Sequence, residues 1–460
     1  MPRYVADTLE NFLIGGNFMK LNVKLTVLVG FAFLSISAFW QMYDSLVPLI
    51  LSSTFQVDKT FSGIIMAADN ILALFLLPLF GGISDRCQSR LGRRKPFILV
   101  GTLLAVSLMS LLPILDNSYY ASPAPIKAIG FIVILGLLLI SMGTYRSPAV
   151  ALMPDVTPKP LRSKGNAIIN LMGAVGGIIY LIITSFLYSK SRTEGLDHIN
   201  YLPIFLIVAG IMLLALLILF LFINEPKLAA EQKKYEEAHP EQQLTEETDK
   251  GEKMPKAVKK SLTFLLLSIA FWFIGYNAVS TWFTTFATGV WGMAVGDATL
   301  CLTIATAGAI VSYIPVGAVA SKIGRKKTIL FGVVLLASSF FAAFLYTLFA
   351  NNFSPVLYVL FILIGIAWAS INVNSLPMAV EMCSGKDVGK FTGLYYTFSM
   401  SAQTITPVLS GFLYDHVSEK VLFLYSAVAV TLAFVTMMFV RHGDNKVEAK
   451  TGLDAFDIDD

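Results

Sequence analysis

Residues 81–97 read Gly81-Gly-Ile-Ser-Asp-Arg-Cys-Gln-Ser-Arg-Leu-Gly-Arg-Arg-Lys-Pro-Phe97, and residues 317–327 read Gly317-Ala-Val-Ala-Ser-Lys-Ile-Gly-Arg-Lys-Lys327. Each stretch follows a long apolar run, and in each a late glycine is followed by a cluster of Arg and Lys. Two such stretches in one chain indicate that the first half of the sequence is repeated in the second half.

Other elements of the two halves recur in the same order. Tyr43-Asp44 in the first apolar run is matched by Tyr276-Asn277 in the seventh run. Asp155, after the fourth run, is paralleled by Glu381 after the tenth. Duplication of this kind is typical of transporters in which two halves rock about a site near the membrane midplane.

The apolar runs are long enough to cross a bilayer as helices, which takes about 20 residues. The chain is 56% hydrophobic and 14% charged, whereas a soluble domain carries about 25% charged residues. In lipid, only helices and closed barrels satisfy every backbone group, and runs this long favour helices. The expected spans are 25–52, 62–83, 96–115, 128–150, 166–188, 202–223, 262–290, 298–317, 328–348, 356–379, 391–413 and 420–440. We therefore predict an all-α membrane protein with twelve transmembrane helices in two pseudo-symmetric six-helix halves.

The positions of Lys and Arg predict that both termini are cytoplasmic, because cytoplasmic loops carry an excess of basic residues. With the N-terminus inside, the basic residues that are not cytoplasmic are Arg146, which lies inside a span, and Lys59, Lys127, Lys190, Arg192 and Lys420, which lie outside the cell. The predicted units are a cytoplasmic segment 1–24, an N-terminal half 25–223, a charged cytoplasmic linker 224–261, a C-terminal half 262–440 and a cytoplasmic tail 441–460.

Asp44 and Asp69 lie inside consecutive expected spans, at similar depths. A carboxylate in a span costs roughly 2.5–3.5 kcal/mol on insertion scales, and by default it marks a functional site. We expect the two acids to form one ion-coupling site. A proton needs a single carboxylate, whereas Na⁺ would take oxygen ligands from both acids and from Asn70. The sequence leaves the choice between a proton and Na⁺ open.

Aromatic and amide side chains accompany these acids. Trp40 and Asp44 share one helix face, and Gln41 flanks it. Sugar C–H groups pack on aromatic rings, while sugar hydroxyls need donors and acceptors. Arg146 either faces the cavity or extends its side chain to the membrane interface. Apart from Lys420 at the first position of the last span, the spans of the second half carry no charged residue. They hold Asn277, Trp282, Trp368, Asn372, Asn374, Tyr395, Tyr396 and Gln403. The expected substrate-binding residues are Trp40, Gln41, Tyr43, Asn70, Arg146, Tyr276, Asn277, Asn374 and Gln403.

The pattern Gly-x-x-x-Asp-Arg-x-Gly-Arg-Arg after the second span is the signature of the major facilitator superfamily, which the chain resembles over essentially its whole length. The extra residues before Gly92, together with Ala68-Asp69-Asn70 and Pro377-Met-Ala-Val-Glu381, are similar to the glycoside/cation and sucrose:proton symporters. The resemblance implies the major facilitator fold, a sugar substrate and a cytoplasmic loop that fastens helices in one state and releases them in the other. The gating residues that it implies are Asp85, Arg86, Gly92, Arg93, Arg94, Asp155 and Glu381.

The expected function is therefore secondary active import of a sugar with a proton or Na⁺, by a monomer in the lipid bilayer of the cell membrane. One alternative is a drug or organic-solute:proton antiporter of the same superfamily, and another is a membrane sugar sensor that does not transport. The sequence has no Walker phosphate-binding loop, metal-ligand cluster or nucleophile–base motif. We accordingly expect no enzymatic activity, no organic cofactor, no bound metal and no nucleic-acid partner.

Overall fold

The computed structural model describes residues 21–158, 161–238, 255–350, 352–382 and 388–444. Most of the predicted segments 1–24 and 441–460, and part of the linker 224–261, lie outside the described residues. The N-terminal half contains α2 (Val23–Ser53), α3 (Lys59–Asp85), α4 (Lys95–Ala121), α5 (Pro125–Val156), α6 (Arg162–Leu187), the short α7 (Lys190–Thr193) and α8 (Leu202–Phe222). The linker contains α9 (Glu225–Ala238). The C-terminal half contains α10 (Lys256–Gly289), α11 (Val295–Ile323), α12 (Arg325–Phe349), α13 (Val356–Val380), α14 (Val388–His416) and α15 (Val421–Met438).

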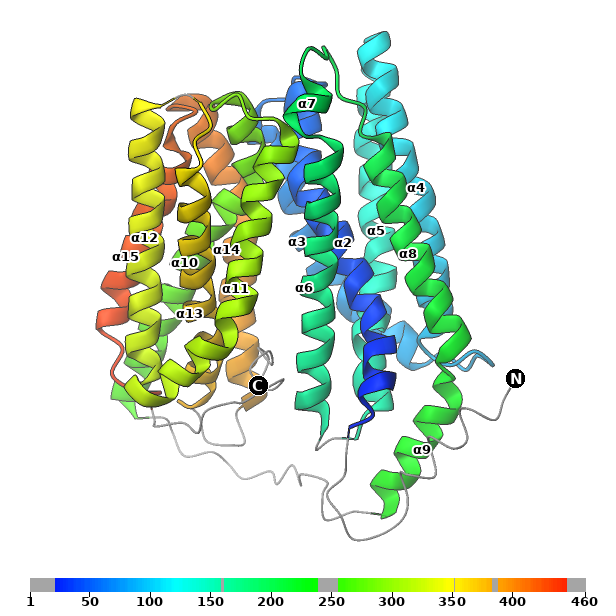
Figure 1. Ribbon diagram of the computed structural model, residues 1–460. Helices are drawn as coiled ribbons and strands as arrows, with labels where there is room; N and C mark the ends of the chain where they lie inside the picture. The colour runs from blue at the N-terminus through cyan, green and yellow to red at the C-terminus, as the bar shows by residue number, and fades with distance from the viewer. Residues whose placement is uncertain (1–20, 159–160, 239–254, 351, 383–387, 445–460) are drawn as a thin grey trace.

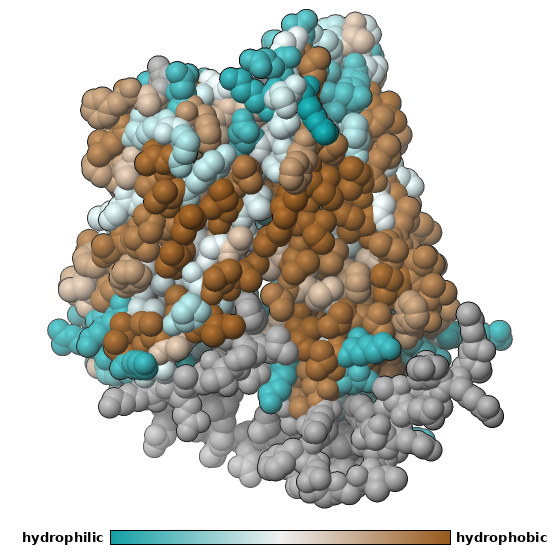
Figure 2. Space-filling model, in the orientation of Figure 1, coloured by the Kyte–Doolittle hydropathy of each residue, from teal (hydrophilic) through white to brown (hydrophobic). Residues whose placement is uncertain are grey.

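The predicted all-α membrane architecture is confirmed. Within the described ranges, eleven helices are long and apolar enough to cross a membrane. The remaining expected span, 391–413, falls on α14, which is 29 residues long but more polar because it carries Tyr395, Ser399 and Gln403. Figure 2 shows a broad hydrophobic band between hydrophilic ends, as a bilayer-spanning bundle requires. Twelve spans and cytoplasmic termini stay predictions.

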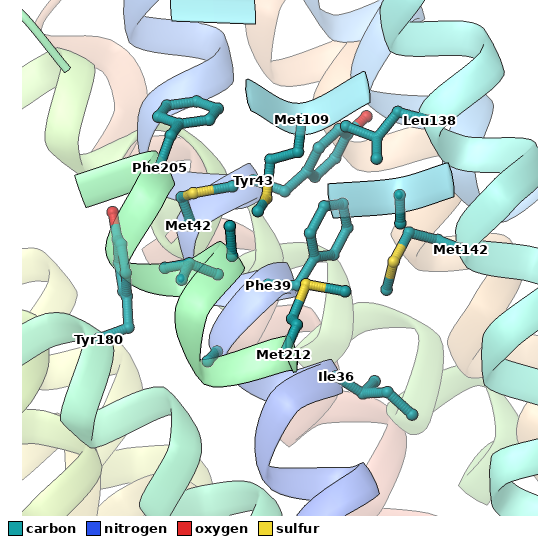
Figure 3. Packing of buried hydrophobic residues seen from close by; sticks show 14 of the residues in the cluster. Ile36, Phe39, Met42, Tyr43, Met109, Leu138, Met142, Tyr180, Phe205 and Met212 are labelled. Carbon is teal, nitrogen blue, oxygen red and sulfur yellow. The ribbon is translucent and has the colours of Figure 1, made fainter. Parts of the chain in front are cut away.

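Each half packs around its own hydrophobic core. The core of the N-terminal half is rich in flexible methionines and aromatics, among them Phe39, Met42 and Met142 (Figure 3). The core of the C-terminal half is built on rings, with Trp291 stacked on Phe423 at 5.6 Å between centroids. Figure 1 shows the two bundles side by side, joined in sequence through α9 and the linker. Because the cores are separate, each half can move as a body.

The start of α3 illustrates how the sequence fixes a helix end. The first turn of a helix leaves backbone N–H groups without partners inside the helix. Asp58 precedes α3, and its Oδ1 accepts a hydrogen bond from the N–H of Phe61 at 2.7 Å. An aspartate at this position stabilises a helix by roughly 0.5–2 kcal/mol. This cap sets the first residue of α3 at the boundary between loop and membrane.

The two halves meet at the end of the bundle where α3 begins and α14 ends, which we call the predicted outer end. Here α3 crosses α14 so closely that a Cβ on Gly63 would overlap the carbonyl group of Pro407. On the other side of the bundle, the N–H of Gly296 in α11 donates to the carbonyl of Tyr188, just after α6, at 2.8 Å. Figure 1 shows α6 and α11 close together at this end and apart at the other, and Figure 2 shows a hollow between the halves on that lower side.

Candidate functional site

A cavity of about 480 Å³ lies between the two halves. Its walls come from α2, α3 and α5 on one side and from α10, α13 and α14 on the other. The N-terminal half supplies all of its charged groups, and the C-terminal half supplies amides, hydroxyls and rings. The lining residues are Trp40, Asp44, Met66, Asp69, Asn70, Arg146, Phe273, Asn277, Ser280, Thr281, Trp368, Asn372, Leu376, Tyr395, Tyr396, Ser399, Met400, Gln403 and Pro407.

The charged wall brings the two predicted acids into one site. Asp44 from α2 and Asp69 from α3 both line the cavity, close enough for their charges to interact. Asn70 Nδ2 donates to Asp69 Oδ1 at 2.8 Å. The juxtaposition was expected from their matched depth in consecutive spans. The coupling role assigned to them stays a prediction.

Arg146 completes this wall. The sequence left open whether its side chain faces the cavity or the membrane interface, and the structure places it in the cavity lining. Its guanidinium carbon lies 5.6 Å from the centre of the Trp40 ring, within the range of a cation–π interaction. Its charge also interacts with that of Asp69. The wall thus holds two carboxylates and one fixed cation.

The opposite wall is neutral. Asn277, the repeat counterpart of Asp44, lines the cavity together with Asn372 and Gln403. Tyr276 lies behind this wall, where its ring stacks on Trp368 at 3.7 Å between centroids. The Tyr276 ring therefore orients the Trp368 indole, whose ring also contacts Phe273 edge-on at 5.3 Å. Such a ring pair presents a rigid aromatic surface to a ligand.

Two polar atoms at the cavity are buried without a hydrogen-bond partner. They are Nε1 of Trp40 on the charged wall and Nδ2 of Asn277 on the neutral wall. Leaving a buried donor unpaired costs roughly 1–3 kcal/mol. Both atoms lie beneath the surface of their wall, so pairing either donor requires its side chain to turn towards the cavity.

Four predicted substrate-binding residues lie outside the cavity lining: Gln41, Tyr43, Tyr276 and Asn374. Successive helical residues point about 100° apart, so Tyr43 turns into the core while its neighbour Asp44 faces the cavity. The Tyr43 side chain is 1% exposed and contributes to the packing in Figure 3. Asn374 is buried, and its Nδ2 donates to the carbonyl of Ser370 in its own helix at 3.0 Å. Gln41 lies beside Gly177 of α6.

Several lining residues gave no signal in the sequence. Phe273, Ser280, Thr281 and Ser399 are residue types found on every face of a membrane helix. Nothing in their spacing separates them from residues that pack against neighbouring helices. They can be identified as cavity-lining residues only after α10 and α14 have been placed around the cavity.

The predicted gating residues lie at the end of the bundle opposite the predicted outer end, in one cluster in each half. Arg94 forms ion pairs with Asp85 at 2.5 Å and with Asp155 at 2.7 Å. Arg93 lies 3.9 Å from Asp155, and Arg86 lies exposed where α3 ends. Burial alone would lower the pKa of Arg94, but the two carboxylates outweigh it and raise that pKa further above its usual value. Arg94 is therefore a permanent cation that ties α3 and α5 to the start of α4.

A residue that carries no signal in the sequence holds this cluster in place. The Glu225 carboxylate, at the start of α9, accepts hydrogen bonds from the backbone N–H groups of Arg93, Arg94 and Lys95 at 2.6, 2.9 and 3.0 Å. Gly92 has a φ of +112°, and a Cβ there would overlap the Glu225 side chain. A glycine is therefore required at position 92.

The C-terminal half repeats the arrangement. Gly324 has a φ of +96°, and the Oδ1 of Asp444 accepts from the N–H of Lys326 at 3.1 Å. Arg325 pairs with Glu381, as Arg94 pairs with Asp155. The repeat seen in the sequence thus extends to its hydrogen bonds, with Asp444 in the place of Glu225.

Replacing both Arg93 and Arg94 with Ala is expected to slow transport several-fold without abolishing ligand binding, because the cluster lies away from the cavity. The measurement is ligand affinity and exchange rate in the same purified protein. Since these charges also help to orient the chain, the topology of the variant must be checked by labelling. Complete loss of binding in correctly inserted, folded protein would contradict the placement.

Comparison with known proteins assigns the family. The family model of the Major Facilitator Superfamily matches residues 29–294 and 287–456. The chain belongs to this superfamily. The resemblance inferred from the Gly81–Phe97 stretch is thereby confirmed, as is a multi-pass location in a membrane.

Relatives within the superfamily match part of the chain. Sucrose transport protein SUC3 of Arabidopsis thaliana is 29% identical over 152 residues, covering 30% of this chain and 25% of that protein. Sucrose transport protein SUT3 of Oryza sativa subsp. japonica is 31% identical over 138 residues, covering 27% of each. Proton-associated sugar transporter A of Mus musculus is 32% identical over 126 residues, covering 26% of this chain and 17% of that protein. The chain thus spans about a quarter or less of the length of these relatives, all of which are named as transport proteins and not as enzymes.

Solved structures of the superfamily share the fold over nearly the whole chain. A POT family transporter in complex with 5-aminolevulinic acid has a TM-score of 0.68 at 15% identity, covering 91% of this chain and 96% of that one. The xylose transporter XylE of E. coli, in its inward open conformation, has a TM-score of 0.65 at 14% identity. The match covers 93% of this chain and 98% of that one. At these identities the likeness establishes the major facilitator fold alone.

Proposed function

We propose that this superfamily member is a secondary active transporter that imports a sugar together with a proton or Na⁺. One observation carries the proposal: a single cavity between the halves joins Asp44, Asp69 and Arg146 on one wall to Asn277 and Gln403 on the other. A ligand that touches both walls is coupled to the movement of one half against the other, as alternating access requires.

The neutral wall supports a sugar as the substrate. Amides both donate and accept hydrogen bonds, which suits hydroxyl groups. The Trp368 face, held by Tyr276, offers an apolar plate for sugar C–H groups. The cavity volume of about 480 Å³ lies in the ordinary range for small-molecule sites. The names of the relatives, which transport sucrose or are proton-associated sugar transporters, favour the same class of substrate.

The net charge of the wall formed by the N-terminal half supports coupling to one monovalent cation. Asp44 and Asp69 together carry two negative charges when ionised, and Arg146 supplies one positive charge. An uncompensated charge in a low-dielectric site is costly, so the wall favours the uptake of one further cation, a proton or Na⁺. Coupling follows because the loaded wall is neutral and can be closed off from water, whereas the unloaded wall cannot.

The proposed cycle loads the cation and the sugar from outside and releases both inside. With both termini in the cytoplasm, the contacts at the predicted outer end correspond to a state closed towards the outside. The driving energy is about 2.3 kcal/mol per charge for each 100 mV of membrane potential, plus the concentration gradient of the ion. We further propose that the protein works as a monomer in the cell membrane.

The test is counterflow exchange in proteoliposomes that hold the full chain. Vesicles loaded with unlabelled sucrose, or with a glycoside such as maltose or melibiose, should take up the matching labelled sugar faster than empty vesicles do. The parent protein in vesicles loaded with an uncharged polyol of similar size is the control. Exchange of none of these sugars, together with exchange of an apolar drug, would favour the antiporter instead and overturn the proposal.

A further inference from the structure

The carboxylate of Asp415, near the end of α14, binds the start of α3 across the boundary between the halves. It accepts a hydrogen bond from the N–H of Lys59 at 3.1 Å and from the N–H of Thr60 at 2.7 Å. The Thr60 hydroxyl donates to the same carboxylate at 2.7 Å. The first N–H groups of a helix have no partner within the helix, and the helix dipole favours an anion there. Asp415 therefore acts as a helix cap supplied by the opposite half.

The first turn of α3 is shared between two carboxylates. Asp58, in the same half as α3, takes the N–H of Phe61. Asp415, in the other half, takes the N–H groups of Lys59 and Thr60. When the halves separate at this end, the contact with Asp58 stays and the contacts with Asp415 are lost. Of the two aspartates, only Asp415 joins the two halves, so replacing Asp58 serves as a control for replacing Asp415.

Two close backbone contacts bring Asp415 within reach of α3. A Cβ on Gly411, one turn before Asp415, would overlap the carbonyl oxygen of Lys59. A Cβ on Gly63, one turn after Lys59, would overlap the carbonyl of Pro407. The ammonium group of Lys59 lies over the Tyr414 ring, 5.3 Å from its centre. Small residues on both helices therefore let the short Asp415 side chain reach the backbone of α3.

We propose that Asp415 is a positioning residue that stabilises the state closed at the predicted outer end by capping α3 from the opposite half. The inference rests on the proposed function in one respect, namely that the two halves alternate between states. Each turnover must break the three hydrogen bonds to Asp415 and remake them. The strength of this inter-half cap then helps to set the fraction of molecules that are open towards the outside.

The experiment measures this fraction directly, without substrate. Cys87, Cys301 and Cys383 are replaced, and spin labels are attached at Ala121, at the end of α4, and at Asn352, between α12 and α13. Both positions are exposed, and they belong to opposite halves at the predicted outer end. Electron–electron distance measurements in lipid nanodiscs then give the populations of short and long distances. The same protein is assayed for sugar exchange in proteoliposomes.

Asp415→Asn is expected to raise the ratio of long to short distances about fivefold, because hydrogen bonds to a charged acceptor weaken when the charge is removed. Asp58→Asn is the matched control, since it removes a carboxylate from the same helix turn without touching the other half. It should leave the ratio unchanged. Thr60→Val, which removes one of the three hydrogen bonds from the α3 side, should shift the ratio in the same direction by a smaller amount.

Unchanged distances in both Asp415→Asn and Thr60→Val would overturn the proposal, and so would an equal shift in Asp58→Asn. If Asp415→Asn does not fold, Thr60→Val alone decides the matter. Failure of the proposed function gives a different result. In that case the parent exchanges no sugar, yet Asp415→Asn still shifts the distances.

Discussion

Replacing Asp69 with Asn is expected to abolish the accumulation of sugar driven by an ion gradient while sugar exchange continues. The variant leaves Asp44 and Arg146 as the charged groups of the cavity, so the wall becomes neutral without an added cation. Asn keeps the shape and can still hydrogen-bond a ligand, but it cannot carry an exchangeable proton. Asn70 Nδ2, which donates to Asp69 Oδ1 at 2.8 Å, retains an acceptor in the variant.

The measurement compares gradient-driven uptake with counterflow in the same proteoliposomes. Accumulation should fall to the level of vesicles without a gradient, and counterflow should stay within a few-fold of the parent. Asp44→Asn, assayed beside it, should behave in the same way, because it also leaves one carboxylate facing Arg146. If Asp69→Asn accumulates sugar as well as the parent does, the coupling role of this residue is wrong. If Asp44→Asn loses exchange as well, Asp44 contacts the sugar.

Gly411→Ala is expected to reduce both uptake and counterflow by about tenfold or more. The added Cβ meets the backbone carbonyl of Lys59, which cannot rotate away as a side chain could. Overpacking of this kind costs typically 1–3 kcal/mol, and each 1.4 kcal/mol is a factor of ten in an equilibrium. Because the overlap exists when the outer end is closed, the variant should stay open towards the outside.

Gly393→Ala is the matched control. It makes the same change on the same helix, and a Cβ at position 393 meets no atom within 4 Å. Transport by this variant should equal that of the parent. Equal loss in both variants would mean that the glycines serve the stability of α14 rather than the closure of the outer end.

The sequence predicted much of the fold because membrane helices follow a local rule. A run of apolar residues must form a helix wherever it lies, so the span 391–413 was placed within α14 before any neighbour was known. The shared site of Asp44 and Asp69 was predicted in the same way. The two acids lie at matched depth in consecutive helices, and consecutive membrane helices usually pack against each other. The internal repeat identified Asp155 and Glu381 as counterparts, and each of them pairs with an arginine of its own half.

The details of the site could not be predicted, because they depend on rotation about a helix axis and on distant partners. Tyr43 and Asp44 are neighbours in sequence, yet one packs in the core and the other lines the cavity. Glu225 and Asp415 looked like ordinary residues near a span end. Their partners lie more than a hundred residues away in sequence, and no spacing rule connects them.

The most direct test of the proposed symport is ion movement driven by sugar alone. Proteoliposomes with an internal pH dye and no ion gradient are given an external sugar that passes the counterflow test. If the protein is a proton symporter, the interior should acidify as sugar enters, and Asp69→Asn should abolish the signal while exchange persists. If Na⁺ is the coupling ion, ²²Na⁺ should enter instead. Sugar entry with neither proton nor Na⁺ influx, or with ion efflux, would contradict the proposed symport.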